Sequence, residues 1–406
     1  MARAYGPAMG IDAPAARGLR YDDEQAAWIA EVYDDVVDIL KDQRHFSAVN
    51  SIGIAPFETM RDEVREVLEA GLPRFPGIIE MDPPQHTGYR RLVNEGFTPR
   101  RVAALEPGIR EIAHDLLDGL TPQTGADFVT AFGDPLPIRV IGRILGVPPE
   151  DTDHVQHLSD AFRTLEAGTI GTLPLERQVE TAHRFVAFQR YVERMVEQRR
   201  ESPGEDLVSV LVQTPLAGER PLTRDELVST VIHLLFAGQE TTTRLIASMV
   251  NLLLSDRPLW DRVRAEPELI PTAVEETLRL EPPVTYHLRQ AKAPVTVGGT
   301  PMAPGDAVHL VFRRANRDAG VFPDPDAMDL ERGNASRHLG LGRGIHFCVG
   351  APIGRLEAKV ALEVLTARVP TLRLVPGRPA EREQHAMLGG LGSLPVEWDR
   401  IEARPA

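Results

Sequence analysis

The longest apolar run in the chain lies within LTRDELVSTVIHLLFAGQETTTRLIASMVNLLLSDRP, and it ends at Pro258. Thr223 and Glu226 are three residues apart at its start and form a capping box, which marks the beginning of a helix. A helix of about thirty residues, rising about 1.5 Å per residue, crosses a whole domain. Because this segment is apolar on nearly every face, the pattern predicts a helix buried in the middle of the protein.

The rest of the pattern predicts a mainly α chain with a small β portion. Residues 1–23 look irregular, and AAWIAEVYDDVVDILKD begins like a strand near Trp28 before it takes helical spacing. DPPQHTGYRRLV is a good helix entry, and helical spacing dominates from about 103 to 213, with breaks at TPQTG, VPPED and SPGED. The pattern then predicts two helical segments to about 280, a β-like stretch over 284–313, a long irregular segment from Ala315 to His338, a helix over about 351–368 and a tail of β-hairpins. Without repeats or low-complexity linkers, a single domain over residues 1–406 is the simplest organisation.

Composition narrows the class of protein. Hydrophobic residues make up 42% and charged residues 26% of the chain, as in ordinary globular proteins. The single cysteine cannot form an internal disulfide, so a disulfide-stapled secreted fold is excluded. No signal-like or membrane-length apolar run is present, and we expect a cytoplasmic protein that does not bind a membrane. The net charge of -14 argues against nucleic acid as a partner.

That single cysteine lies in HLGLGRGIHFCVG, a loop dense in glycine. Cys348 could act as a nucleophile beside His346, as a metal ligand, or as a merely buried thiol in a turn. The glycines allow the backbone to coil closely around the sulfur and to donate N–H groups to it, which favours a tuned metal ligand. One cysteine cannot hold zinc or an iron–sulfur cluster, but one thiolate can hold haem iron.

The loop resembles the haem-binding signature of the cytochrome P-450 family, Phe-x-x-Gly-x-x-x-Cys-x-Gly. This chain supplies Gly344, Cys348 and Gly350. Leu341 stands where the family has Phe, whose ring packs beside haem and thiolate, so the departure concerns the tuning of the iron and not its ligation. The resemblance implies the P-450 fold, with the long central helix over the haem and Cys348 as the proximal iron ligand.

Two further motifs support this resemblance. In EETLR, Glu276 and Arg279 share a helix face, and Arg332 in MDLER matches the arginine with which the family's Glu-x-x-Arg pairs, a structural role. AGQETT, which begins at Ala237, matches the family's oxygen-activation motif. The resemblance implies that Glu240 delivers protons and that Thr241 bonds to the activated oxygen.

Basic residues occupy the positions at which the family binds the haem propionates. His86 and Arg90 lie one helical turn apart in HTGYR, and Arg289 and His346 also match in position. Arginine gives bidentate, charge-assisted hydrogen bonds to a carboxylate. Each of these residues alone would be an ordinary surface charge, but all four match positions that the family uses, which favours haem binding.

The resemblance implies a monooxygenase that inserts one oxygen atom from O2 into a small organic substrate, most simply by hydroxylation. Its cofactor would be haem b (heme b, iron protoporphyrin IX), with electrons coming ultimately from NAD(P)H through a ferredoxin and a ferredoxin reductase. A basic docking patch for that acidic partner is expected among Arg90, Arg91, Arg100, Arg101 and Arg343.

The substrate is expected to be mainly apolar. By position, its contacts should come from residues 57–79, 162–175, 236–237 and 284–288 and from the hairpin near Met387. The side chains that we expect to line the pocket are Phe236, Val284, Tyr286, His287 and Leu388. Tyr286 and His287 could orient a polar group or simply pack against the rest of the protein.

Other functions remain open at this stage. A haem-thiolate enzyme could instead carry out oxidative coupling or peroxide-driven chemistry, although the Glu240–Thr241 pair argues against dependence on peroxide. A haem-binding sensor without turnover would need a signalling partner domain. A cysteine hydrolase would be favoured if the purified protein carried no chromophore.

Overall fold

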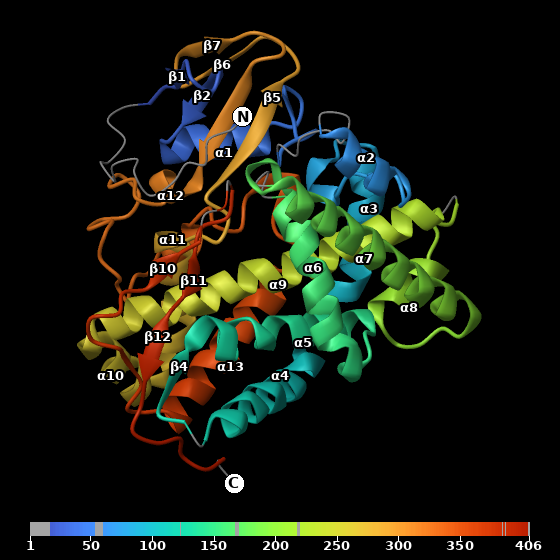
Figure 1. Cartoon of the computed structure of the whole chain (residues 1–406). Coiled ribbons are helices and arrows are strands. Elements are labelled where there is room, and N and C mark those ends of the chain that lie inside the picture. The colour runs from blue at the N-terminus through green and yellow to red at the C-terminus, as the bar shows by residue number, and fades with distance from the viewer. Residues whose placement is uncertain are drawn as a thin grey trace. The chain divides into compact units, whose positions relative to one another are not determined.

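The computed structural model describes residues 17–52, 60–121, 123–166, 170–216, 220–383, 385 and 387–404, shown in Figure 1. These residues divide into two compact units. The first unit comprises residues 47–98 and 138–239, and the second comprises residues 17–46, 99–137 and 240–404. Each unit is built from chain segments that are distant in sequence.

The first unit is helical. Its elements are α2 (Asp62–Glu69), α3 (Gln85–Asn94), most of α5 (Pro135–Leu145), α6 (Thr152–Glu166), α7 (Leu175–Glu201), α8 (Leu207–Gln213) and the start of α9 (Arg224–Ser255). The long helix α7 packs against α2, α6 and α8. Gln189 of α7 fixes the segment after α2, because its side chain accepts from the N–H of Leu72 at 2.9 Å and donates to the Leu72 carbonyl at 3.0 Å.

The second unit contains the β portion. Its main sheet has the order β1 (Arg20–Asp22), β2 (Ala27–Ala30), β8 (Ala307–Val311), β5 (Tyr286–Ala291) and β3 (Phe46–Ser47). β2 and β8 run parallel, whereas β1–β2 and β5–β8 pair antiparallel. A buried apolar cluster joins this sheet to α1 (Tyr33–Lys41) and to the short helix α12 (Phe312–Ala315). The hairpin β6 (Val295–Val297) and β7 (Thr300–Met302) lies beside it.

The helices of the second unit pack around α13 (Ala351–Arg368), which contacts α4 (Pro99–Leu120), α10 (Arg257–Ala265) and α11 (Ile270–Leu280). The predicted bounds of α13 are confirmed. The prediction of a long buried helix is also confirmed, because α9 has 32 residues and most of them are buried. Its capping box forms as expected, with the Glu226 side chain accepting from the N–H of Thr223 at 2.7 Å and the Glu226 N–H donating to the Thr223 hydroxyl at 3.3 Å.

Two sequence predictions need correction. Residues 20–22 are not irregular, because they form β1 against β2; residues 1–16 lie outside the described part of the chain. The described residues of the tail contain one hairpin, β10 (Glu381–Arg382) with β11 (Leu391–Ser393). β12 (Pro395–Glu397), however, pairs with β9 (Arg373–Leu374) and with β4 (Gly125–Asp127). A strand as short as β4 has no pattern of its own, and its partner lies about 270 residues away in sequence, so local spacing could not reveal it.

Candidate active site

The cysteine loop places its sulfur at the start of a helix. Cys348 follows the helical turn Gly344–His346, and Gly350 is the N-cap of α13. The N–H of Cys348 donates to the carbonyl of Leu341 at 2.9 Å, which closes the loop upon itself. The N-terminal end of a helix carries partial positive charge, so this position favours a thiolate over a thiol.

Gly344 is required by the shape of this loop. Its φ of +69° lies in the left-handed region that side chains rarely adopt. A Cβ at this position would also collide with the backbone carbonyl of Leu40 at the end of α1. The glycine therefore lets the loop turn directly against α1.

Arg355 stands two turns along α13 from the loop. Its Nε and Nη2 donate to both carboxylate oxygens of Glu275 at 2.6 and 2.8 Å, and these hydrogen bonds are the main reason why its pKa is raised. An electrostatic interaction with Cys348 makes a smaller contribution that raises the same pKa. The same ion pair, together with His338, lowers the pKa of Glu275 to about 2 although burial opposes this.

One face of the buried helix α9 is open. His233 and Thr241 are partly exposed and Ala237 is exposed, although their neighbours along the helix are largely buried. These three residues are spaced by four, so they lie on one face of the helix. The predicted oxygen-activation motif therefore contains Ala237, an exposed residue in the largely buried middle of the helix. Phe236, the adjacent predicted pocket residue, is buried against the ring of Phe162.

Glu240, the acid of this motif, is buried at 8% exposure. Its Oε2 accepts a hydrogen bond from Nη2 of Arg244, one turn further along α9, at 3.1 Å. Arg244 was not singled out from the sequence, although a basic residue four positions after an acid in an apolar helix is a readable signal.

The predicted propionate-binding residues occur in both units. In the first unit, His86 is buried on α3 with Arg90 one turn away, and the pKa of His86 is lowered by burial and then by the charge of Arg90. In the second unit, Arg289 is only 5% exposed on β5, and its Nη1 donates to the carbonyl of Leu288 at 2.7 Å. His346 ends the turn that precedes Cys348.

Glu276, Arg279 and Arg332 form a buried cluster in the second unit. The Glu276 carboxylate accepts from Nε and Nη2 of Arg279 at 2.6 and 2.8 Å and from Nε of Arg332 at 3.0 Å. The backbone N–H of Asp329 is a fourth donor, at 3.0 Å. Both arginines also donate to backbone carbonyls of the irregular segment, namely those of Asn316, Pro323, Asp324, Pro325 and Ala327. The three residues thus tie this segment to α11.

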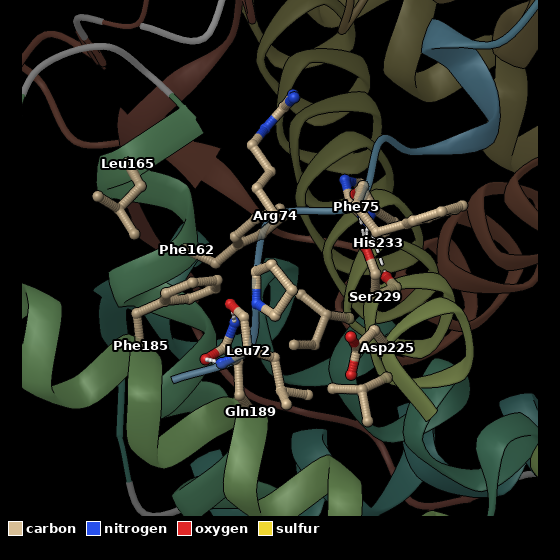
Figure 2. A pocket seen from close by; sticks show the side chains of 13 residues that line it. Leu72, Arg74, Phe75, Phe162, Leu165, Phe185, Gln189, Asp225, Ser229 and His233 are labelled. Carbon is tan, nitrogen blue, oxygen red and sulfur yellow. Dashed lines mark hydrogen bonds between the residues drawn. The ribbon is translucent and has the colours of Figure 1, made fainter. Parts of the chain in front are cut away.

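A pocket of about 480 Å³, counting its open mouth, lies in the first unit (Figure 2). α6, α7, α9 and the segment after α2 line it with Leu72, Pro73, Arg74, Phe75, Phe162, Leu165, Phe185, Gln189, Asp225, Val228, Ser229, Ile232 and His233. The ring of Phe162 stacks on Phe185 with centroids 5.6 Å apart and meets His233 edge to face at 5.2 Å. Two of the expected substrate-contact regions therefore contribute to the pocket, but residues 57–59 and 167–169 lie outside the described chain.

Sequence reasoning missed part of this pocket. The contribution of α7 gave no signal, because Phe185 and Gln189 look like ordinary core positions of a helix. His233 could have been found, since it is polar within an apolar helix and lies one turn before Ala237. Its Nδ1 is 2.7 Å from the Ser229 carbonyl, so the ring carries its proton on Nδ1, and burial lowers its pKa.

The remaining predicted substrate residues lie in the second unit. Val284 and Leu388 form an isolated antiparallel bridge. Tyr286 packs against the His309 ring at 5.2 Å, and burial raises its pKa to about 12. His287 packs edge to face on Phe312 at 5.6 Å. None of these four residues lines the pocket of the first unit.

The second unit by itself contains side chains of the chemical types that bind a haem. It offers one sulfur at a helix N-terminus, a buried guanidinium at Arg289 and an imidazole at His346. A thiolate is a known axial ligand of haem iron, and the two basic side chains suit carboxylates. The fold and these residues define a mainly α protein whose one cysteine lies at a helix N-terminus.

Comparison with known proteins identifies the family. The family model described as "Cytochrome P450" matches residues 44–368. The mycinamicin IV hydroxylase/epoxidase of Micromonospora griseorubida is 39% identical over 92% of this chain and 90% of its own length. The nocardicin C N-oxygenase of Nocardia uniformis subsp. tsuyamanensis is 38% identical over 97% and 94%. The crystal structure of CYP109E1 from Bacillus megaterium with testosterone has a TM-score of 0.80 and 32% identity, covering 94% of this chain and 96% of that one.

The chain therefore belongs to the cytochrome P450 family, and it has the P450 fold. It is a haem-dependent monooxygenase, and the family uses haem b with electrons from NAD(P)H delivered through partner proteins. Within the described residues, no helix combines the length and hydropathy that a membrane crossing requires.

Proposed function

We propose that Cys348 would bind the haem iron through its sulfur and that the chain is one haem domain over residues 1–406. The observation that carries this assignment is the position of the sulfur, at the N-terminus of α13 in a loop closed by glycine turns. In this proposal Arg289, His346, His86 and Arg90 would bind the propionates, and Ala237 and Gly350 would contact the porphyrin. Glu276, Arg279 and Arg332 hold the irregular segment behind it.

When bound, the haem supplies the activation of dioxygen for insertion into the substrate. The protein supplies protons and exclusion of water around it. Glu240 delivers protons from its carboxyl oxygens, and the hydroxyl of Thr241, on the open face of α9, holds the oxygen to which they are delivered. The apolar neighbours on α9 keep other water away from the reacting atoms.

The test of the ligand is the spectrum of the purified protein, reduced and exposed to carbon monoxide. We expect the long-wavelength Soret band that marks thiolate ligation, and its loss in Cys348→Ser. Val349→Ala, the neighbouring position in the same loop, should keep the band and serves as the matched control. A wild-type band at the shorter wavelength would contradict the assignment, and Leu341→Phe would then show whether the missing aromatic ring is the cause.

For the substrate, we propose a mainly apolar molecule that places a ring or branched alkyl group against Phe162 and Phe185. The support is the aromatic wall of the pocket in the first unit (Figure 2). Titration with testosterone and with a linear alkane carboxylate, read by the spin-state shift, tests this. We expect Phe162→Ala to weaken binding of the ring-bearing probe about tenfold or more, because about 1.5–3 kcal/mol of apolar contact is lost. An equal effect on both probes would contradict the proposal.

For the electron donor, we propose an acidic ferredoxin served by its reductase, in the cytoplasm. The support is the group of arginines that includes Arg100 and Arg101, both exposed at the start of α4. Charge reversal at both positions should lower the rate of ferredoxin-dependent reduction and weaken its dependence on salt. Charge reversal at Arg177 and Arg200, on α7, is the control. Identical rates in both double variants would count against this surface.

A further inference from the structure

Glu240 is not held by Arg244 alone, because Arg244 also binds a second carboxylate. Nη2 of Arg244 donates to Oε2 of Glu383 at 2.7 Å and to Oε2 of Glu240 at 3.1 Å. The side chains of Glu240, Arg244 and Glu383 are 11%, 2% and 29% exposed. A buried guanidinium therefore joins a buried acid of α9 to a carboxylate that reaches solvent. All three residues belong to the second unit.

The backbone around Glu383 is built to hold this contact. Glu383 follows β10, and its N–H donates to the carbonyl of Gly390 at 3.3 Å across the β10–β11 hairpin. Gly390 has a φ of +142°, and a Cβ there would come within 2.7 Å of Cγ of Arg244. The side chain of Arg244 thus lies directly against the hairpin backbone, and only glycine leaves room for it.

The distances indicate which of the two hydrogen bonds of Arg244 is the stronger. The shorter bond of Arg244 goes to Glu383, and charge-assisted hydrogen bonds strengthen as they shorten. Nε and Nη1 of Arg244 have no hydrogen-bond partner among the described residues, so the shared Nη2 carries its hydrogen bonding. If Glu240 turned away from Arg244, Glu383 would still compensate the buried positive charge. Without Glu383, that motion would leave a buried cation unpaired, which is strongly unfavourable.

We propose that Arg244 and Glu383 are positioning residues for Glu240, and that Glu383 keeps the hold of Arg244 on Glu240 weak enough for the acid to move. This proposal rests on the function proposed above for Glu240. It gives the C-terminal hairpin a role in oxygen activation that acts through Arg244.

The first test measures the contact itself in the holoenzyme. Urea unfolding of Glu240→Gln, Arg244→Met and the double variant gives the coupling between the two residues, and the same cycle is repeated in the Glu383→Gln background. We expect the coupling constant to rise about tenfold when Glu383 loses its charge, because Arg244 then has one carboxylate instead of two. Glu381→Gln, an exposed position on the same hairpin, should leave it unchanged. Equal coupling in the Glu383→Gln and Glu381→Gln backgrounds would overturn the positioning role.

The second test asks whether the contact matters for proton delivery. It measures the yield of hydrogen peroxide per NADH oxidised, with a ferredoxin and its reductase and no added substrate, in H2O and in D2O. We expect Glu383→Gln to raise the peroxide yield severalfold and to enlarge the solvent isotope effect, Arg244→Lys to retain much of the wild-type behaviour, and Glu381→Gln to match the wild type. A Glu383→Gln variant indistinguishable from Glu381→Gln would refute the proposal.

The two tests also separate this proposal from the one on which it rests. If Glu240→Gln leaves the peroxide yield unchanged, the role proposed for Glu240 fails, whatever the unfolding cycle shows. If Glu240→Gln alters the yield but the cycle shows no effect of Glu383, only the positioning proposal fails.

Discussion

At the scale of single residues, Gly344 and Glu357 of the second unit are two positions at which a single side chain, or its absence, affects the stability of the protein. Gly344 combines a left-handed backbone with a close approach to α1. Glu357, in the middle of α13, is 2% exposed, and its Oε2 has no hydrogen-bond partner within the described chain. The first residue shapes the backbone of the cysteine loop, and the second is a carboxyl group placed where a charge is unfavourable.

Substitution of Gly344 by alanine should destabilise the fold more than the backbone angle alone explains. The left-handed φ costs about 1–2 kcal/mol for a residue with a Cβ, and the collision with Leu40 adds to it. Gly377→Ala is the control, because Gly377 has a similar φ of +74° but no atom within 4 Å of the added Cβ. Urea denaturation of both variants measures the difference. Equal losses of stability would show that the loop can move away from α1 and relieve the collision.

Glu357 gives a prediction for the effect of pH. Burial raises its pKa well above the usual value, so the folded protein keeps this carboxyl protonated where the unfolded chain ionises it. The contribution of protonated Glu357 to the stability of the fold is therefore fully present below the pKa of the unfolded chain, about 4.5. It is lost as the pH rises toward the pKa of the folded protein. The advantage of Glu357→Gln over the wild type should grow between pH 5 and pH 8 in urea denaturation. A difference that stays constant with pH would mean that Glu357 is ionised in the fold.

At the scale of elements, the start of α9 shows how a cap is joined to an ion pair. Glu226 completes the capping box with Thr223 and also binds Arg220 through both carboxylate oxygens at 2.7 Å. The hydrogen bonds from Arg220 are the main reason why the pKa of Glu226 falls to about 2. The helix that carries the oxygen-activation motif is thus fixed at its first turn by groups about four turns away from that motif.

Thr223→Ala should cost about 1 kcal/mol of stability, the usual effect of losing an N-cap side chain. Thr223→Ser retains the hydroxyl and should stay close to the wild type. Chemical denaturation with far-UV detection compares the two, and an alanine variant as stable as the serine variant would show that Glu226 alone caps the helix.

Glu226→Gln tests the ion pair through its pH dependence. The lowered pKa means that this stabilisation is present above the unfolded pKa of 4.5 and is lost as the pH falls toward about 2. The wild type should therefore be more stable than Glu226→Gln by the largest margin at pH 6, and this difference should shrink between pH 4.5 and pH 2. Thermal unfolding across this range measures it, and a gap that persists at pH 2 would point to packing rather than charge.

At the scale of the whole molecule, contacts between distant segments hold the second unit together. Glu276 accepts four hydrogen bonds, two of them from Asp329 and Arg332, which lie 53 and 56 residues further along the chain. A buried charge with all its partners is stable, but loss of one partner leaves the others unpaired. This cluster is therefore more important to the fold than the many ion pairs on the surface.

Glu276→Gln should lower the free energy of unfolding by about 3–5 kcal/mol, since two buried arginines lose their shared anion. Glu397→Gln, which breaks an exposed ion pair with Arg373 at 2.9 Å, should cost less than about 1 kcal/mol. Both are measured by urea denaturation of the holoenzyme. A similar small cost in both variants would show that the neutral amide satisfies the arginines.

Much of the helical framework was predictable, because the spacing of apolar residues and the capping residues of a long helix both lie within the helical segment itself. The capping box of α9 and the span of α13 were read directly from sequence. The motifs also predicted the two arginine partners of Glu276, since the resemblance supplied the long-range match with Arg332, but not the N–H of Asp329. Short strands such as β1 and β4 were missed, because two or three residues carry no period and their pairing depends on segments far away.

The sequence by itself determined the family, the single available thiol and the acid and alcohol of α9, because these depend on residue identity and local spacing. Only the tertiary structure decided that Arg244 divides its hydrogen bonds between Glu240 and Glu383, that α7 helps to line the aromatic pocket, and that Tyr286 and His287 pack against other rings. The physical reason is the same in each case. Apart from Glu240 and Arg244, which lie one helical turn apart, these contacts join side chains that only folding brings within a few ångströms. A separation of up to 139 residues along the chain leaves no local trace of such contacts.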